Sequence, residues 1–409
     1  MKKVQKIAVI MSLILAMCAS AWAWNETDHV SVAPNGKGDL LIYPVYFTGG
    51  GWDTYLTVIN TSPTLSAVAK VVIRSAHRSQ EVRDFFIYLS PTDVWTGTLY
   101  MASDNKPHIM STDDSCLNSS STFASAVAPF DIYLENTCAG DTNTIGYVEI
   151  IEAACFDLGG PPVAKSRIKA AYDGLTSILA ANSPRNILTG LEEVYNDITG
   201  QSFGLNATVL KNYDSRELMS VTVETLLGFN SRNSIAEVEA ALSKNSVAVP
   251  YFSNQLFFGI YTFPTKMAGF PCNVQAWRGK YAGFPSPTVG IQTRDCSENT
   301  TSSPTVFVSP IGQATPLTLS QEVNFLVYGD LKVTFTEGWF VMGLPAGPTS
   351  DFTADGSRLD YSGAPIIASS IRLDSDASGA WLYNAHDLGS VSVDNVLEAQ
   401  YQYFIQTDN

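Results

Sequence analysis

One candidate for chemistry is the segment 200–204, Gly-Gln-Ser-Phe-Gly, which matches the G-x-S-x-G pattern of serine hydrolases. In those enzymes a strand leads into the serine and a helix follows it, so that the hydroxyl stands above a sheet. In this chain helical sequence precedes Ser202 and strand-like sequence, 205–210, follows it, which is the reverse order. We therefore interpret the segment as a glycine-containing turn.

A second candidate is the segment 374–379, Asp-Ser-Asp-Ala-Ser-Gly, which resembles the first half of a calcium-binding loop. Oxygen-bearing side chains at alternate positions, here Asp374, Asp376 and Ser378, followed by glycine, let a chain wrap around a hard cation. The bidentate glutamate that completes such a loop is missing, because Ala385 stands in its place. The sequence leaves two possibilities open, a calcium site or an ordinary turn, and calcium is the one cofactor that it suggests.

Glu149 and Glu152 bring two carboxyl groups together in the sequence, as a glycosidase requires in space. Residues three apart on a strand point to opposite faces, so we expect two separate acids that face solvent or loops. The histidines show no metal-ligand spacing such as H-E-x-x-H, and no nucleotide-binding motif is present. The sequence therefore predicts no catalytic residues.

The cysteines have a pattern typical of disulfides, because none of them forms the C-x-x-C pair of zinc or thioredoxin sites. Cys116 and Cys138 lie in polar, loop-like segments, and Cys272 and Cys296 flank another loop-rich stretch, so we predict the pairs 116–138 and 272–296. Cys155 is left over. It closes an apolar strand, which favours burial over pairing between subunits.

The N-terminus predicts export. Basic residues precede an apolar run over 7–18, and Ala-Trp-Ala at 21–23 supplies the small residues that a signal peptidase needs. We therefore expect a signal peptide at 1–23 and a secreted or cell-surface mature chain, where disulfides persist. The alternative, a lipoprotein signal ending at Cys18, is weakened because Met17 stands where a small residue is needed.

The net charge and the apolar runs of the chain limit the kinds of partner that it can bind. The net charge is −15 at pH 7, which disfavours nucleic acid and anionic membrane surfaces, since both attract basic patches. After the signal, no apolar run reaches the length of a transmembrane helix.

The first part of the mature chain has short apolar segments separated by Gly, Pro and Asn. We predict a mainly β protein whose N-terminal domain, 24–160, is an immunoglobulin-like β-sandwich. Pro44 inside the first strand predicts an edge or a bulge. The expected strands are 39–47, 52–60, 68–74, 84–89, 94–100 and 144–154.

The second domain is expected over 161–409, after the Gly-Gly-Pro-Pro segment at 159–162. It is predicted to be β-rich with a helical segment at about 165–245, in which a capping box at 234–237 opens the last, short helix. Its expected strands are 256–263, 323–328, 332–336 and 365–373.

Six longer phrases of the chain carry a resemblance: LIYPVYF (41–47), VRDFFIYLSPTDVWTG (82–97), STDDSC (111–116), GYVEIIE (146–152), YTFPTK (261–266) and YSGAPII (361–367). Together they resemble a family of exported proteobacterial cell-surface proteins. The resemblance is spread over most of the mature chain and implies export and a shared fold, with no catalytic residues.

These features predict an exported, non-enzymatic structural or surface protein that self-assembles or docks on the cell envelope. Its partners would be copies of itself, as a homo-oligomer, or other envelope components, because strand edges can accept a neighbouring strand. The alternative is a secreted carbohydrate-binding or carbohydrate-active protein.

Overall fold

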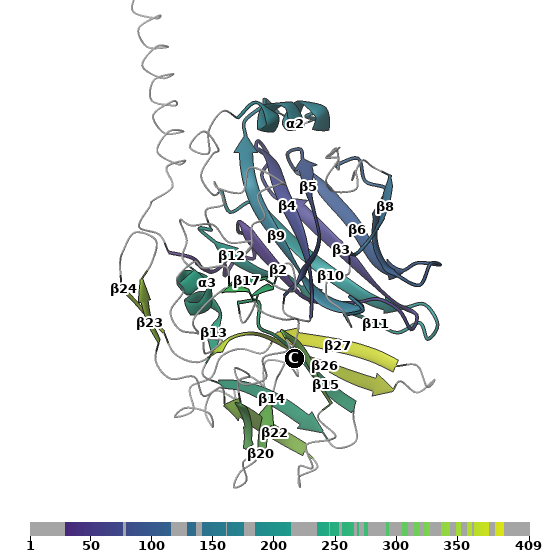
Figure 1. Cartoon of the computed structure of the whole chain (residues 1–409), viewed down its shortest axis with the longest axis vertical. Coiled ribbons are helices and arrows are strands. Elements are labelled where there is room, and N and C mark those ends of the chain that lie inside the picture. Colours follow the sequence, from purple (N-terminus) through teal and green to yellow (C-terminus); the bar gives the residue numbers. More distant parts are fainter. Residues whose placement is uncertain are drawn as a thin grey trace, which may run out of the picture.

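The computed structural model describes residues 29–76, 79–115, 129–135, 141–160, 162–175, 185–213 and 235–244, followed by shorter segments that end at residue 387. The protein is mainly β, with several antiparallel sheets (Figure 1). Within the described residues no helix combines the length and the hydropathy that crossing a bilayer requires.

Two six-stranded sheets form the main body. Sheet A has the order β1 (Ser31–Val32), β12 (Thr208–Lys211), β2 (Leu40–Phe47), β9 (Ile145–Phe156), β4 (Ser66–Ser75) and β5 (Glu81–Leu89). Sheet B has the order β11 (Ser202–Asn206), β10 (Leu188–Asn196), β3 (Trp52–Asn60), β6 (Val94–Met101), β7 (Pro107–Ser111) and β8 (Phe130–Tyr133).

The two sheets share one hydrophobic core in a sandwich-like arrangement. Strand alternation supplies it, since every second side chain points to the same face. Phe85, Ile87 and Leu89 of β5 point into this core, as the sequence predicts, and meet Trp95 of β6, which is fully buried. The Phe85 and Trp95 ring centroids are 5.9 Å apart.

Pro44 lies within β2, which is an inner strand between β12 and β9. The pairing of β2 with β9 shifts register between Tyr43 and Tyr46, so the proline occupies a bulge, one of the two predicted possibilities. The Pro44 carbonyl accepts a hydrogen bond from Thr262 Oγ1 at 2.5 Å. The irregularity thus connects sheet A to a strand much later in the chain.

Strands beyond residue 160 complete both sheets. β10 pairs with β3 along its whole length, from Leu188 opposite Asn60 to Asn196 opposite Trp52. β12 pairs with β2. The segment predicted to be helical at about 165–245 is therefore helical only near its ends among the described residues, and strands occupy 188–211.

Helices and a further sheet cover the outer face of sheet A. α2 (Lys165–Asp173) packs Ile168 and Tyr172 against one end, and α3 (Ile235–Leu242) buries Val238 and Leu242 near the other (Figure 1). A four-stranded sheet contributes Phe258, Ile260, Val323 and Ile367 to the same cluster. Its order is β21 (Val323–Val327), β15 (Leu256–Thr262), β26 (Ile367–Ser375) and β27 (Trp381–Asp387).

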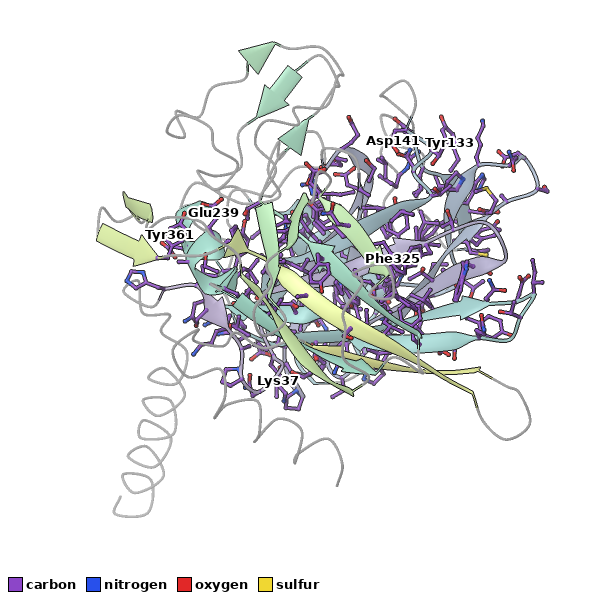
Figure 2. All side chains as sticks on the ribbon, turned by 90° about the horizontal axis from the view of Figure 1, so that it is seen from below. Lys37, Tyr133, Asp141, Glu239, Phe325 and Tyr361 are labelled. Carbon is purple, nitrogen blue, oxygen red and sulfur yellow. The ribbon has the colours of Figure 1, made fainter. Side chains whose placement is uncertain are left out.

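The remaining strands form small antiparallel sheets. Two of them are two-stranded: β13 (Ser243–Lys244) with β25 (Ala364–Pro365), and β23 (Thr349–Phe352) with β24 (Arg358–Tyr361). A four-stranded sheet has the order β14 (Ser246–Phe252), β22 (Glu337–Gly343), β19 (Thr305–Ser309) and β20 (Thr315–Thr318). A three-stranded sheet has the order β16 (Ala268–Gly269), β17 (Val274–Ala276) and β18 (Gln292–Thr293). Tyr361 of β24 donates a 2.5 Å hydrogen bond to Glu239 of α3, and Figure 2 shows the two residues side by side.

Candidate functional site

The outer face of sheet B exposes large side chains to solvent. Tyr55 of β3 is 42 % exposed, Tyr133 of β8 is 44 % exposed and Leu191 of β10 is 44 % exposed. Tyr133 lies at the periphery of the molecule in Figure 2. We call this surface the tyrosine face and define it by the outward-pointing residues Asp53, Tyr55, Tyr100, His108, Met110, Asp131, Tyr133, Leu191, Glu193 and Tyr195.

Strand register arranges the tyrosine face in rows that run across the strands. In one row Glu193, Tyr55, Thr98, Met110 and Asp131 are successive partners. In the neighbouring row Tyr100, His108 and Tyr133 are successive partners, and Tyr195 lies opposite Asp53. Strands are about 4.8 Å apart, so β3 to β8 spans roughly 14 Å. Aromatic rings and carboxylates therefore lie together on one outward face that extends across the sheet.

A hydrogen-bonded group forms the most ordered part of this face. Asp131 accepts a 2.7 Å hydrogen bond from the Tyr100 hydroxyl, and its other oxygen lies 2.8 Å from His108 Nδ1. His108 Nε2 lies 3.3 Å from a carboxylate oxygen of Asp104, in the turn after β6. The Tyr100 and His108 rings meet edge to face, with centroids 5.9 Å apart. These contacts hold the aromatic rings in fixed orientations.

Cationic groups surround Tyr133 at one edge of the tyrosine face. Lys106 Nζ lies 5.0 Å from the Tyr133 ring centroid, and Arg83 Cζ lies 5.5 Å from it. Arg83 also donates a 2.6 Å hydrogen bond to the Tyr133 carbonyl and pairs with Glu135 at 3.1 Å. Cation–π contacts of this kind restrain the ring while leaving much of it open to solvent.

The electrostatics of the face are dominated by acids. Partial burial and then the Asp131 hydrogen bond raise the pKa of Tyr100 to about 12. Partial burial and then Asp197 raise the pKa of Asp53, and partial burial and then Asp53 raise the pKa of Tyr55. Partial burial and the neighbouring acids therefore both disfavour ionisation of Tyr55 and Tyr100, which stay neutral at ordinary pH.

The two glutamates of β9 lie on opposite faces of the strand, as the sequence predicts, and so form no glycosidase pair. They are buried, however, and the expectation that they face solvent or loops is wrong. Glu149 accepts a 2.7 Å hydrogen bond from Arg74 Nε on the covered face of sheet A. Glu152 lies beside Asp39 at the end of the core, and its carboxylate accepts a 3.2 Å hydrogen bond from the Arg185 N–H. Both acids have partners that hold strands together.

Cys155 is buried, as predicted, and its thiol donates a 3.0 Å hydrogen bond to Glu152 Oε1. Burial, and then the Glu152 charge, raises the pKa of the thiol well above its usual range, so the reactive thiolate is suppressed. The predicted disulfide cysteines, Cys116, Cys138, Cys272 and Cys296, lie outside the described residues.

The G-x-S-x-G segment begins in the hairpin turn between β10 and β11 and continues into β11, so the turn interpretation holds for 200–201 and not for 202–204. Gly200 has φ of +70° and its N–H is bonded to the Asn196 carbonyl at 2.8 Å, while Ser202 begins β11. The preceding element is the strand β10, so the expectation of helix before the serine is wrong. No nucleophile elbow forms here.

Of the three candidate calcium ligands, one lies within the described residues. Asp374 belongs to the end of β26, where its backbone pairs with Leu382 of β27. Asp376 and Ser378 lie outside the described residues. Within the described part of the chain no three His, Cys, Asp or Glu side chains form a group that could hold a metal ion. Calcium binding at Asp374, Asp376 and Ser378 therefore stays a prediction.

Sequence reasoning missed the tyrosine face. Tyr100, His108 and Asp131 belong to three different strands, and only their register brings them together. The available signal was the alternation of β3 and β6, which places Tyr55, Thr98 and Tyr100 on the face opposite the core.

Comparison with family models, with curated proteins and with solved structures finds no match to this chain.

Proposed function

We propose that the protein is an exported, non-enzymatic surface protein that docks on the cell envelope by binding a neutral polysaccharide through the tyrosine face. The observation that carries this proposal is the alternation of exposed tyrosine rings and carboxylates on an open sheet. A tyrosine presents an apolar ring with a polar tip. Sugar rings offer apolar C–H faces for such rings and hydroxyl groups for neighbouring carboxylates.

The shape of the face supports binding over catalysis. Asp131 and Glu193 are exposed to solvent and Asp53 is half-buried, whereas electrostatic catalysis depends on a site that excludes water. An outward sheet face that spans roughly 14 Å from β3 to β8 suits an extended polymer better than a small substrate. Export is supported by the signal-like segment 1–23, and the resemblance to exported proteobacterial surface proteins is consistent with it.

Charge argues against self-assembly through this face. Two copies placed face to face would bring two acidic surfaces together, each with Asp53, Asp131 and Glu193, and like charges at close range disfavour contact. A basic protein would complement the acids, but the polymer is favoured because exposed rings accompany them. This proposal is compatible with homo-oligomers that form through strand edges. It is also compatible with an immunoglobulin-like connectivity of sheets A and B.

A co-sedimentation screen tests the proposal. The mature chain would be mixed with insoluble polysaccharides that are neutral, anionic or cationic, and the bound fraction would be measured at physiological salt. We expect retention on a neutral polysaccharide that survives raised salt, because ring stacking is not screened by ions. Retention on cationic material alone, or on none, would contradict the proposal. N-terminal sequencing of the exported protein should begin at Trp24.

A further inference from the structure

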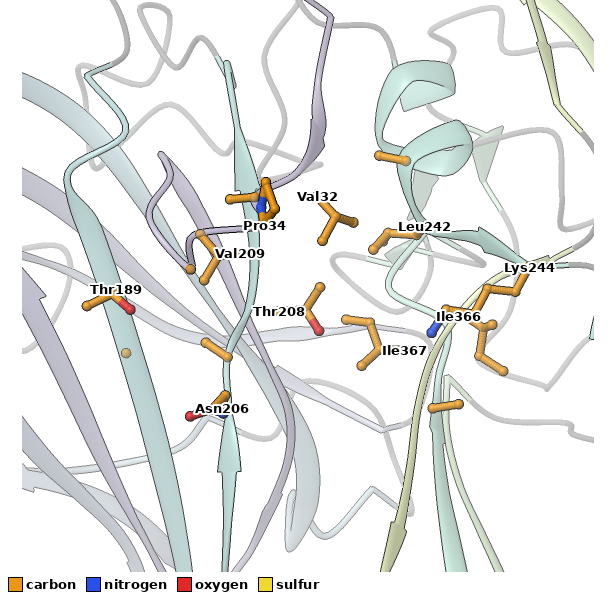
Figure 3. Close-up of a pocket in the computed structure, with 16 residues that line it drawn as sticks. Val32, Pro34, Thr189, Asn206, Thr208, Val209, Leu242, Lys244, Ile366 and Ile367 are labelled. Carbon is orange, nitrogen blue, oxygen red and sulfur yellow. The ribbon is translucent and has the colours of Figure 1, made fainter. Parts of the chain in front are cut away.

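Lys70 of β4 is a fully buried lysine. Lysine side chains normally keep their charged tip in water and are almost never completely buried without a partner. Lys244, by contrast, is half-buried and lines a hollow of about 540 Å³ between the two-sheet body and the helix α3 with strand β26 (Figure 3). The chemistry of Lys70 is therefore set by the side chains that the fold places beside it.

Asp84 of the neighbouring strand β5 contacts this ammonium. Lys70 Nζ lies 2.7 Å from Asp84 Oδ2, and the two side chains are 0 % and 1 % exposed. The other carboxyl oxygen, Asp84 Oδ1, is buried and has no hydrogen-bond partner among the described residues. The attraction of a buried ion pair offsets the lost hydration only when the remaining polar atoms are hydrogen-bonded as well. The ionised form of this pair is therefore poorly stabilised.

A second carboxyl group, that of Glu81, stands beside the pair. Its side chain is 13 % exposed, and one of its oxygens lies 3.8 Å from Arg74 Nη2. Burial raises the pKa of Glu81, the Lys70 charge opposes that rise and the Asp84 charge adds to it. A protonated carboxyl group can give a proton to a departing oxygen and, once ionised, can accept one. An amine, an acid and a proton relay thus lie together on the covered face of sheet A.

We propose that Lys70 and Asp84 condense after folding into an amide bond that joins β4 to β5. Lys70 first passes a proton to Asp84 across their contact, which leaves a neutral amine and a neutral acid. The Nζ lone pair attacks Asp84 Cγ, Glu81 gives a proton to the leaving hydroxyl and takes one back from Nζ, and one water molecule departs. The Nζ–Cγ bond forms, one Cγ–O bond breaks, and no atom is oxidised or reduced.

The exclusion of water favours this condensation. In bulk water the solvent drives the reverse reaction, hydrolysis, whereas here both reacting groups are withdrawn from it and the amide removes two buried charges. β5 is the last strand of sheet A, so the bond fixes a strand whose one neighbour in that sheet is β4. The bond is separate from the tyrosine face and does not depend on the proposed polysaccharide binding.

The intact mass of the mature chain, measured after reduction of any disulfides, tests the proposal. We expect a mass below that calculated from the sequence by one water molecule. Trypsin should leave the peptide bond after Lys70 uncut, because the amine it recognises is blocked, and fragmentation should show a branched peptide that contains both Lys70 and Asp84. The full calculated mass, together with tryptic cleavage after Lys70, would overturn the proposal.

Variants assign the bond to its residues. Lys70→Met/Asp84→Leu removes both buried charges together, so the chain should still fold and should have its full calculated mass. Lys165→Met is the control, because Lys165 pairs with Asp93 closer to the surface, and it should keep the mass deficit. A deficit that persists in the double variant, or that is lost in Lys165→Met, would place the bond elsewhere and overturn the assignment.

Glu81→Gln tests the proton relay while leaving both reacting groups in place. Wild type and variant would be made by cell-free synthesis, and their masses would be sampled over time. Because general acid–base catalysis is lost, the variant should condense at least about 100-fold more slowly. Equal rates of condensation would overturn the role of Glu81.

Discussion

The carboxyl groups of Asp39 and Glu152 are buried beside each other at the end of the core between sheets A and B, where the Glu152 N–H donates a 2.7 Å hydrogen bond to the Asp39 carbonyl. Asp39 is fully buried and Glu152 is 3 % exposed. Asp39 Oδ1 also accepts a 2.6 Å hydrogen bond from the Asn186 N–H, and Glu152 Oε1 accepts one from the Arg185 N–H at 3.2 Å. The pair therefore ties β2 and β9 to the segment that leads into β10.

This pair predicts a pH dependence of stability. Burial raises the pKa of both acids, that of Asp39 well above its usual range, so the folded chain holds protons that the unfolded chain releases above about pH 4. The free energy of unfolding should therefore fall as pH rises from about 4 through the folded-state pKa values.

Asp39→Asn should reduce that pH dependence, because the amide can donate to Glu152 without a shared proton and its oxygen can still accept from Asn186. Urea unfolding midpoints at several pH values between 4 and 8 provide the measurement. Asp173→Asn, at an exposed helical site, is the control. Parallel pH profiles for Asp39→Asn and the wild type would refute the shared-proton account.

A second prediction concerns Arg74, whose Nε lies 2.7 Å from Glu149 on the covered face of sheet A. Arg74→Met leaves the Glu149 carboxylate buried beside an apolar group, which should lower the free energy of unfolding by about 3–5 kcal/mol. Adding Glu149→Leu should restore much of the loss, because both charges are then removed. Chemical denaturation measures each step.

Lys169→Met is the matched control for this pair, because Lys169 and Asp173 form an ion pair on the exposed side of α2. Its unfolding midpoint should stay close to that of the wild type, since surface ion pairs contribute little. An equal loss of unfolding free energy in Arg74→Met and Lys169→Met would show that the buried ion pair stabilises the protein no more than the exposed one.

A third prediction concerns Gly190 in β10. The Tyr43 hydroxyl donates a 2.7 Å hydrogen bond to the Thr57 carbonyl, which links sheet A to sheet B directly beneath this glycine. A Cβ on residue 190 would collide with the Tyr43 hydroxyl and lie 2.6 Å from the Thr57 oxygen. Gly190→Ala should therefore lower the free energy of unfolding by about 1–3 kcal/mol.

Gly160→Ala is the appropriate comparison, because nothing lies within 4 Å of an added Cβ there. It should leave the melting temperature nearly unchanged. Equal melting temperatures for Gly190→Ala and Gly160→Ala would contradict the close approach of Tyr43 to β10.

A fourth prediction concerns the tyrosine face. The pKa of Tyr100 is raised to about 12 by partial burial and by its hydrogen bond to Asp131. Asp131→Asn removes the charge and should lower the pKa toward the ordinary value of about 10, while burial keeps part of the shift. Ultraviolet difference titration against Tyr100→Phe isolates this phenol. An unchanged titration would mean that the hydrogen bond contributes nothing.

Much of the fold could be predicted from local patterns. The alternation over 84–89 correctly places Phe85, Ile87 and Leu89 on one buried face, and Pro44 correctly marks an irregular strand. The helix expected around 165–245 was overestimated because β10 alternates less clearly: Gly190 and Glu192 stand at inward positions where apolar residues usually stand. Tertiary contacts with Tyr43 decide these positions, and no local pattern reports them.

The candidate site could not be predicted from spacing. Asp131 meets His108 and Tyr100 only after β6, β7 and β8 have paired in their final register, and 23 positions separate Asp131 from His108 in the sequence. The buried acids were mistaken for exposed ones for a similar reason. Arg74 lies 75 positions from Glu149 and nothing in the sequence connects them.

The affinity of the mature chain for a soluble oligomer of a neutral polysaccharide, compared with that of Tyr55→Ala/Tyr133→Ala, tests the proposed function most directly. Both tyrosines are exposed, so folding should be preserved, and circular dichroism would verify this. Ile145→Ala removes an exposed apolar side chain at the start of β9 and is the control. We predict at least about a tenfold loss of affinity in the double variant and none in the control. Equal affinities for all three proteins would contradict the assignment of the tyrosine face as the docking surface.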